Sequence, residues 1–200
     1  MGSGNSPWCA LVGDDEMSRY NQLTAWCAKH KPTVIVEVGA HKGERAEAMI
    51  RAAKHKFGHY LGFDLWEAGD AVTDATEYNG KGRSEKAETE KRLAKTNWSI
   101  TLTQGNTRET LKNFDAPYDV AFIDGGHSVE TIESDWDNIH ERMNWTGATF
   151  LDDFYNKSVD TSRFGCNRLV ESLEKDPAFR VTKLPVIDGH TQMIKVEWSK

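Results

Sequence analysis

The sequence predicts an α/β fold in which helices cover both faces of a doubly wound, mostly parallel sheet. Three observations lead to this prediction. Short apolar runs rich in β-branched residues alternate with segments of helical periodicity along the chain. Several of these runs end abruptly in an acid, at the edge where open α/β sheets bind their ligands. Near the C-terminus, two extended segments flank Asp188-Gly189, which is a hairpin turn signal.

The predicted elements form five β–α units and a closing antiparallel hairpin at one edge. The first helix ends at Lys31-Pro32, because the residue before a proline avoids helical geometry. The first strand is apolar on both faces except at Glu37, which is typical of a central parallel strand. The seven predicted strands are 33–38, 59–64, 99–103, 118–124, 148–151, 180–184 and 192–198. The predicted helices are 14–30, 44–56, 84–96, a short one near Leu111, 129–143 and 167–174.

The length of 200 residues suits a single domain, 1–200. Residues 1–13 are predicted to form an N-terminal arm whose first residues resemble a tag remnant. Residues 65–98 contain seven acids and six bases and are longer than a plain connection between two strands requires. An excursion of this length at the carboxyl edge of a sheet predicts a lid or a substrate-selecting insertion.

The composition disfavours several classes of protein. A formal net charge of −6 argues against a dedicated nucleic-acid binder, which usually has a basic surface. No apolar run approaches the roughly 20 residues that a membrane helix needs, and the N-terminus lacks signal-peptide features, so we expect a cytoplasmic protein. Cys9, Cys27 and Cys166 are predicted to be buried free thiols rather than a disulfide framework or a zinc site. A homo-oligomer is compatible with the sequence.

Acids gather at one edge of the predicted sheet. Asp124 ends the strand 118–124, and Asp152 with Asp153 follows the strand 148–151. The helix between these strands makes a βαβ unit, so both strands are expected to be parallel and to end at the same edge. Open α/β sheets bind ligands outside that edge. The three acids therefore predict a site for a cation, a polar ligand or both.

A glycine turn follows the first strand. The segment Glu37-Val38-Gly39-Ala40-His41-Lys42-Gly43 has the spacing G-x-x-x-G rather than the G-x-G-x-x-G of dinucleotide enzymes. Glycines let the backbone approach a ligand closely, and the start of the next helix offers unpaired N–H groups. Glu37 suits a cationic group, such as the amino end of an amino acid. The alternative is a tight turn that needs glycine for packing alone.

Asp64 ends the second strand about twenty residues after this turn. In doubly wound folds an acid at this place commonly accepts hydrogen bonds from ribose hydroxyls. The alternative is a solvent-facing acid at the end of a strand. Leu65 and Trp66 follow, and either could form an apolar wall beside a base, while Trp66 suits the protein core equally well.

Together these motifs make residues 33–153 resemble a class I S-adenosylmethionine-dependent methyltransferase, whose fold is Rossmann-like. The resemblance implies S-adenosylmethionine as the cofactor, with Asp64 on its ribose and the loop at Gly105 and Asn106 against its adenine. The cofactor-binding residues that it implies are Glu37, Gly39, Ala40, Gly43, Asp64, Leu65, Gly105, Asn106 and Asp124.

Residues 122–130 and 147–153 are similar to one branch of that superfamily, which contains macrocin-type sugar O-methyltransferases. The resemblance implies Asp124, Asp152 and Asp153 as ligands of Mg²⁺ or another divalent cation. Because adjacent residues of a strand point in opposite directions, Asp152 and Asp153 can both bind the cation only if the strand bends there. The alternative has one of these acids contacting the cofactor amino group or capping the next helix, without a metal.

One position departs from the pattern of that branch. Its members usually carry Asp-Gly-Asp, with the second Asp as general base, where this chain has Asp124-Gly125-Gly126-His127. His127 is the natural substitute because imidazole titrates near neutrality. We therefore predict His127 and Asp124 as catalytic residues. The alternative is that His127 caps the following helix or binds substrate.

The leading hypothesis is methyl transfer from S-adenosylmethionine to a hydroxyl of a small polar acceptor, a sugar or a polyhydroxylated metabolite, assisted by a metal. A second hypothesis keeps the fold but methylates nitrogen, or nucleic acid, without a metal. The prolines that usually follow strand four in DNA amino-methylating enzymes are absent from residues 124–127. A third hypothesis is a non-enzymatic cofactor-binding module or a hydrolase that uses the acid cluster.

Overall fold

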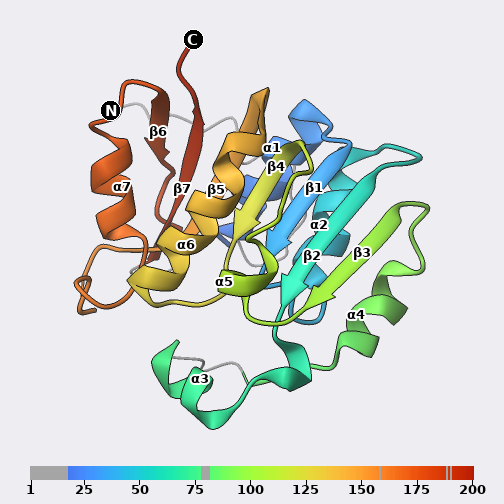
Figure 1. Cartoon of the computed structure of the whole chain (residues 1–200). Coiled ribbons are helices and arrows are strands. Elements are labelled where there is room, and N and C mark those ends of the chain that lie inside the picture. Colours follow the sequence, from blue (N-terminus) through green and yellow to red (C-terminus); the bar gives the residue numbers. More distant parts are fainter. Residues whose placement is uncertain (1–17, 78–81, 158, 188, 190) are drawn as a thin grey trace.

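The computed structural model describes residues 18–77, 82–157, 159–187, 189 and 191–200. A seven-stranded sheet has the order β3-β2-β1-β4-β5-β7-β6, and β7 is the one described strand that runs opposite to the other six (Figure 1). The strands are β1 Val34–Val38, β2 His59–Asp64, β3 Ser99–Gln104, β4 Tyr118–Ile123, β5 Met143–Tyr155, β6 Phe179–Lys183 and β7 Thr191–Trp198. The predicted sheet with its antiparallel edge hairpin is confirmed. The predicted arm, 1–13, and the turn residue Asp188 lie outside the described residues.

Helices cover both faces of the sheet, with α1 and α2 on one face and α5 and α6 on the other (Figure 1). They are α1 Tyr20–His30, α2 Glu44–Ala53, α3 Ala71–Thr76, α4 Lys86–Leu93, α5 Thr107–Thr110, α6 Val129–Ile139 and α7 Asn167–Leu173, with 3-10 turns η1 Trp66–Ala68 and η2 His140–Arg142. Alternate residues of β1 contribute side chains to two hydrophobic clusters, one on each face of the sheet. Ile35 packs with residues of α1 and α2, and Val36 packs with residues of α6 and α7.

Two smaller expectations concern thiols and membrane helices. Cys27 and Cys166 are buried free thiols, as predicted, and Cys9 lies outside the described residues. None of the helices in the described part of the chain is long and apolar enough to cross a membrane.

The predicted helices 44–56 and 84–96 are shorter in the structure, and a larger change of boundary lies between α6 and β5. The predicted helix 129–143 ends at Ile139, and β5 begins at Met143 rather than Ala148. Met143 is buried and pairs with Tyr118 of β4, so its apolar side chain is part of the sheet and not of the apolar face of the helix. Within the insertion, α3 forms where no helix was predicted. Asp70 caps its start by accepting a hydrogen bond of 2.7 Å from the Thr73 N–H.

β5 changes course at the two neighbouring acids. Its pairing with β7 shifts register between Leu151 and Phe154, and Asp153 has a left-handed φ of 59°. A bulge of this kind bends a strand and re-aims its side chains. The strict alternation of a regular strand is therefore interrupted at Asp152 and Asp153, before β5 pairs with β7 again at Phe154.

Candidate active site

A cavity of about 390 Å³ opens at the carboxyl edge of the sheet. Its walls are the glycine turn after β1, the end of β2, the start of α5 and the loop after β4. Residues of η1, α3 and the segment 82–84 complete it, and α3 lies beyond the carboxyl ends of the strands (Figure 1). The predicted cofactor residues that line this cavity are Glu37, Gly39, Ala40, Asp64, Leu65, Asn106 and Asp124.

The glycine turn is required by the close approach of two chain segments. Gly39 has a φ of 93°, and a Cβ on it would overlap the backbone carbonyl oxygen of Asp124. Packing alone therefore demands glycine here, and the same residue also lines the cavity. Gly43 and Gly105 have φ values of 72° and 141° and are not among the residues that line the cavity.

Glu37 is a fully buried acid at the wall of the cavity. Its Oε2 accepts a hydrogen bond from the Tyr60 hydroxyl, and its Oε1 has no hydrogen-bond partner among the described residues. Burial raises the pKa of Glu37 to about 8. A buried acceptor without a partner is costly, so this oxygen suits a donor or a cation brought by a ligand.

Asp64 ties two loops together. Its Oδ2 accepts from the His41 N–H at 2.7 Å, and its Oδ1 accepts from the Trp66 N–H at 2.7 Å. Trp66 is only 2% exposed, and its indole N–H donates to the His41 carbonyl at 2.7 Å. Trp66 is thus a buried residue that also contributes to the cavity wall. The ribose contact of Asp64 stays a prediction.

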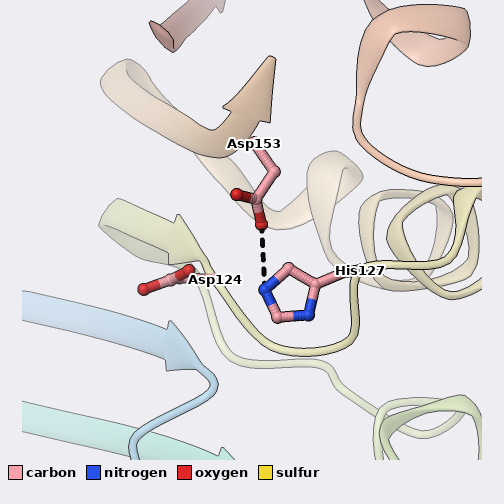
Figure 2. Close-up of side chains that lie close together, drawn as sticks. All are labelled: Asp124, His127 and Asp153. Carbon is pink, nitrogen blue, oxygen red and sulfur yellow. Dashed lines mark ion pairs between the residues drawn. The ribbon is translucent and has the colours of Figure 1, made fainter. Parts of the chain in front are cut away.

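Three potential metal ligands converge from the end of β4, the following loop and β5 (Figure 2). Asp124, His127 and Asp153 each offer one ligand atom, and these atoms lie within 4.8 Å of one another. Nε2 of His127 lies 3.3 Å from Oδ2 of Asp153, and its Nδ1 lies 2.7 Å from the backbone carbonyl oxygen of Glu77. Burial and the neighbouring Asp152 charge raise the pKa of Asp153.

Asp152 is not one of these three ligands, although its side chain also interacts with Asp124. Its two oxygens accept hydrogen bonds of 2.8 Å from Nε and NH2 of Arg19, and the Tyr20 hydroxyl lies 3.2 Å from Oδ2. Burial would raise the pKa of Asp152, but the hydrogen bonds and charge of Arg19 hold it below its ordinary value. Of the three predicted metal ligands, the fold brings Asp124 and Asp153 together and pairs Asp152 with an arginine.

Sequence comparison places this site in a family. Residues 36–154 match a family described as a methyltransferase domain, which spans more than half of the chain. The chain belongs to this methyltransferase family. The expected class I S-adenosylmethionine-dependent methyltransferase is confirmed, whereas the sugar O-methyltransferase branch stays a prediction. No curated protein sequence matches the methyltransferase significantly.

Solved structures share the fold of this methyltransferase at low sequence identity. Cofactor-bound Rv0187 from MTB has a TM-score of 0.70 at 13% identity, covering 98% of this chain and 91% of that one. The O-methyltransferase TomG from Streptomyces achromogenes, in complex with SAM, has a TM-score of 0.66 at 14% identity, covering 94% and 84%. An O-methyltransferase from Bacillus cereus in complex with SAH has a TM-score of 0.65 at 14% identity, again covering 94% and 84%.

Nothing in the sequence marks Arg19 or Glu77 as part of the methyltransferase's site. Arg19 is separated from Asp152 by 133 positions, and Glu77 is separated from His127 by 50. A buried acid requires a cation or donors nearby, so the acid pair predicts that partners exist. It does not predict which residues they are, because only the folded chain brings them together.

Proposed function

We propose that this methyltransferase transfers the methyl group of S-adenosylmethionine to a hydroxyl oxygen of a small polar acceptor, such as a sugar or a polyhydroxylated metabolite. The observation that carries the proposal is the convergence of Asp124, His127 and Asp153 beside the cavity. TomG and the Bacillus cereus protein are described as O-methyltransferases and were solved with SAM and SAH. One fold hosts many acceptors, so the choice of oxygen rests on the site itself.

Glu37 supports the assignment of this cavity to the cofactor. Oε1 of Glu37 has no hydrogen-bond partner in the described part of the chain, and it suits the ammonium group of S-adenosylmethionine. Gly43 and Gly105 act through the turns that their positive φ allows. The proposal assigns cofactor binding to Glu37, Gly39, Ala40, Gly43, Asp64, Leu65, Gly105, Asn106 and Asp124.

A divalent cation fits the donor set of Asp124, His127 and Asp153. Mg²⁺ accepts carboxylate oxygens, and an imidazole nitrogen also suits transition metals. Nδ1 of His127 bonds to a backbone carbonyl, which is a usual second contact of a metal-binding histidine. We assign the site to Mg²⁺ or another divalent cation, with Asp152 left to its pair with Arg19. A bound cation supplies charge that lowers the pKa of an acceptor hydroxyl.

His127 and Asp124 are the proposed catalytic residues. Both line the cavity, where they can meet and orient an acceptor hydroxyl. With Nδ1 of His127 donating to a carbonyl, Nε2 keeps a lone pair. That lone pair can serve as a metal ligand or as the acceptor of the hydroxyl proton, and removal of metal distinguishes the two roles.

The test is methyl transfer to a panel of sugars and polyols with and without EDTA, with calorimetry of S-adenosylmethionine binding in parallel. We expect EDTA to abolish metal-stimulated turnover and to leave cofactor affinity unchanged. Asp153→Asn should weaken Mg²⁺ activation by about 10-fold or more. Asp160→Asn, which alters an exposed acid in the next loop, is the matched control.

Two outcomes would contradict parts of this proposal. Turnover that is insensitive to EDTA would contradict the metal site and leave Nε2 of His127 as the proton acceptor. Cofactor binding without transfer to any hydroxyl in the panel, but with transfer to an amine, would contradict O-methylation.

A further inference from the structure

Glu77 joins the insertion to the loop that carries His127. It directly follows α3, and its backbone carbonyl oxygen lies 2.7 Å from Nδ1 of His127. Its carboxylate accepts hydrogen bonds from the Ser128 N–H at 2.9 Å, from the Ser128 hydroxyl at 3.0 Å and from the Thr131 hydroxyl at 2.7 Å. One residue therefore holds both the imidazole ring and the start of α6.

Gly126 leaves the space that this carboxylate fills. A Cβ at position 126 would stand 2.6 Å from Oε2 of Glu77 and 2.6 Å from Cγ2 of Thr131. Any side chain at this position would have to displace one of these neighbours. The absence of a side chain beside His127 thus allows a carboxylate from a distant segment to take that place.

The Glu77 carbonyl also decides which nitrogen of His127 carries a proton. A carbonyl oxygen only accepts, so Nδ1 must donate, and Nε2 of the neutral ring then presents a lone pair. That lone pair lies 3.3 Å from Oδ2 of Asp153 (Figure 2). Two acceptors at this distance require a cation or a proton between them. The contact with Glu77 therefore accompanies a ring orientation in which Nε2 of His127 faces the acids.

We propose that Glu77 is a positioning residue for the methyl-transfer reaction. It fixes the ring of His127 toward Asp153, and through α3 it couples the docking of the insertion to the assembly of the acidic group. The inference rests on the proposed function, because it assigns His127 to the acceptor side of the site. Glu77 is not itself a base, because three donors already engage its carboxylate.

The main test compares Glu77→Ala with the wild type under identical conditions. Alanine keeps the backbone carbonyl at position 77 but lacks the carboxylate that anchors it to Ser128 and Thr131, so the carbonyl should no longer be held against Nδ1. Long-range ¹H–¹⁵N NMR of the His127 ring should report the Nδ1–H form in the wild type and a mixture of tautomers in Glu77→Ala. Mn²⁺ affinity, followed by electron paramagnetic resonance, should fall about 10-fold, because mutation of an outer-shell partner weakens a metal site by that order. Calorimetric affinity for S-adenosylmethionine should be unchanged.

Thr76→Ala is the matched control. Thr76 precedes Glu77, is exposed, and its hydroxyl donates only within α3, to the Val72 carbonyl at 2.8 Å, among the bonds of the described residues. This variant should match the wild type in ring tautomer, Mn²⁺ affinity and cofactor affinity. A loss of Mn²⁺ affinity equal to that of Glu77→Ala would overturn the specific role of Glu77.

Two further variants keep the inference testable if Glu77→Ala does not fold. Glu77→Gln has one acceptor oxygen in place of two, so its effect on the His127 tautomer should be smaller than that of Glu77→Ala. Gly126→Ala should displace the Glu77 carboxylate and lower Mn²⁺ affinity, and its effect should shrink when Glu77 is already alanine.

The two proposals fail in separate ways. A wild-type protein that binds no Mn²⁺ and no Mg²⁺ contradicts the metal site, whereas the His127 ring signal tests Glu77 without any metal. An unchanged His127 tautomer in every folded variant of Glu77 would overturn the positioning role.

Discussion

The half of the site that we propose binds the cofactor and the half that we propose binds the acceptor are held together by different kinds of contact. We call them the cofactor half and the acceptor half. In the cofactor half, at the ends of β1 and β2, neighbouring loops bind one another through backbone groups, as when Asp64 accepts from the amides of His41 and Trp66. In the acceptor half, side chains from distant segments meet, as when Arg19 pairs with Asp152 across 133 positions. The cofactor half therefore depends on loop shape, and the acceptor half depends on individual charged contacts.

This difference predicts which substitutions each half tolerates. A loop held by backbone contacts fails where a side chain enters a place that has room only for glycine. A site held by charged side chains fails where one partner of a buried pair is removed. The following substitutions test the comparison in order of decreasing expected effect.

Gly39→Ala should disrupt both the cofactor half and the acceptor half, because the added Cβ would overlap the backbone of Asp124. Left-handed strain and overpacking each cost about 1–3 kcal/mol, so we expect a loss of about 3 kcal/mol or more in the free energy of unfolding. Urea denaturation and calorimetry of cofactor binding measure the effect. Gly189→Ala has a similar φ of 72° but open space around it, so it should show the strain alone.

Arg19→Ala should break the acceptor half and spare the cofactor half. It leaves Asp152 buried without its guanidinium, which costs about 3 kcal/mol of stability near neutral pH. The pKa of Asp152 is depressed in the folded protein, so this stability is present above the ordinary pKa of an aspartate. It is lost as the pH falls through the depressed value.

The control for that prediction is Arg51→Ala, which removes an exposed pair with Glu47 and should leave the unfolding curve unchanged. If Arg19→Ala and Arg51→Ala unfold at the same urea concentration, the acceptor half does not depend on its charged pair.

Among these substitutions, Glu37→Gln should have the smallest effect, and it tests a single contact in the cofactor half. The pKa of Glu37 is raised to about 8 in the free protein, so pairing with an ammonium group must release a proton below that pH. Affinity for S-adenosylmethionine should rise between about pH 6 and 8, by at most about 10-fold per unit. Calorimetry should show this slope in the wild type and lose it in Glu37→Gln. An equal pH dependence of affinity in both proteins would contradict the proposed contact between Glu37 and the cofactor.

The loops that we propose to bind the cofactor could be placed from the sequence because their signals are local. Apolar runs that end in Glu37-Val38-Gly39 and in Asp64 specify strand, turn and helix within a few residues, and these residues line the cavity. The proximity of Asp124 and Asp153 was predictable for the same reason, since each follows an apolar run at a shared edge of the sheet.

The rest of the acceptor half was beyond sequence reasoning. The roles of Asp152 and Asp153 diverge at a bulge that no turn residue announces, because Asp153 adopts a left-handed conformation without being glycine. The partners Arg19 and Glu77 belong to segments whose docking depends on the whole fold. In the sequence, Arg19 and Glu77 cannot be told apart from ordinary charged surface residues.

The pairing of Arg19 with Asp152 also bears on the order of folding. During synthesis α1 leaves the ribosome long before β5 exists, so the arginine must wait for its acid while β1 to β4 assemble. Contacts of such long sequence separation close late, because the intervening chain must first lose its freedom. In pulsed hydrogen exchange, protection that depends on the Arg19 contact should therefore appear after that of β1 and β2. The residue that precedes α1 thus depends on a strand that is made late in synthesis.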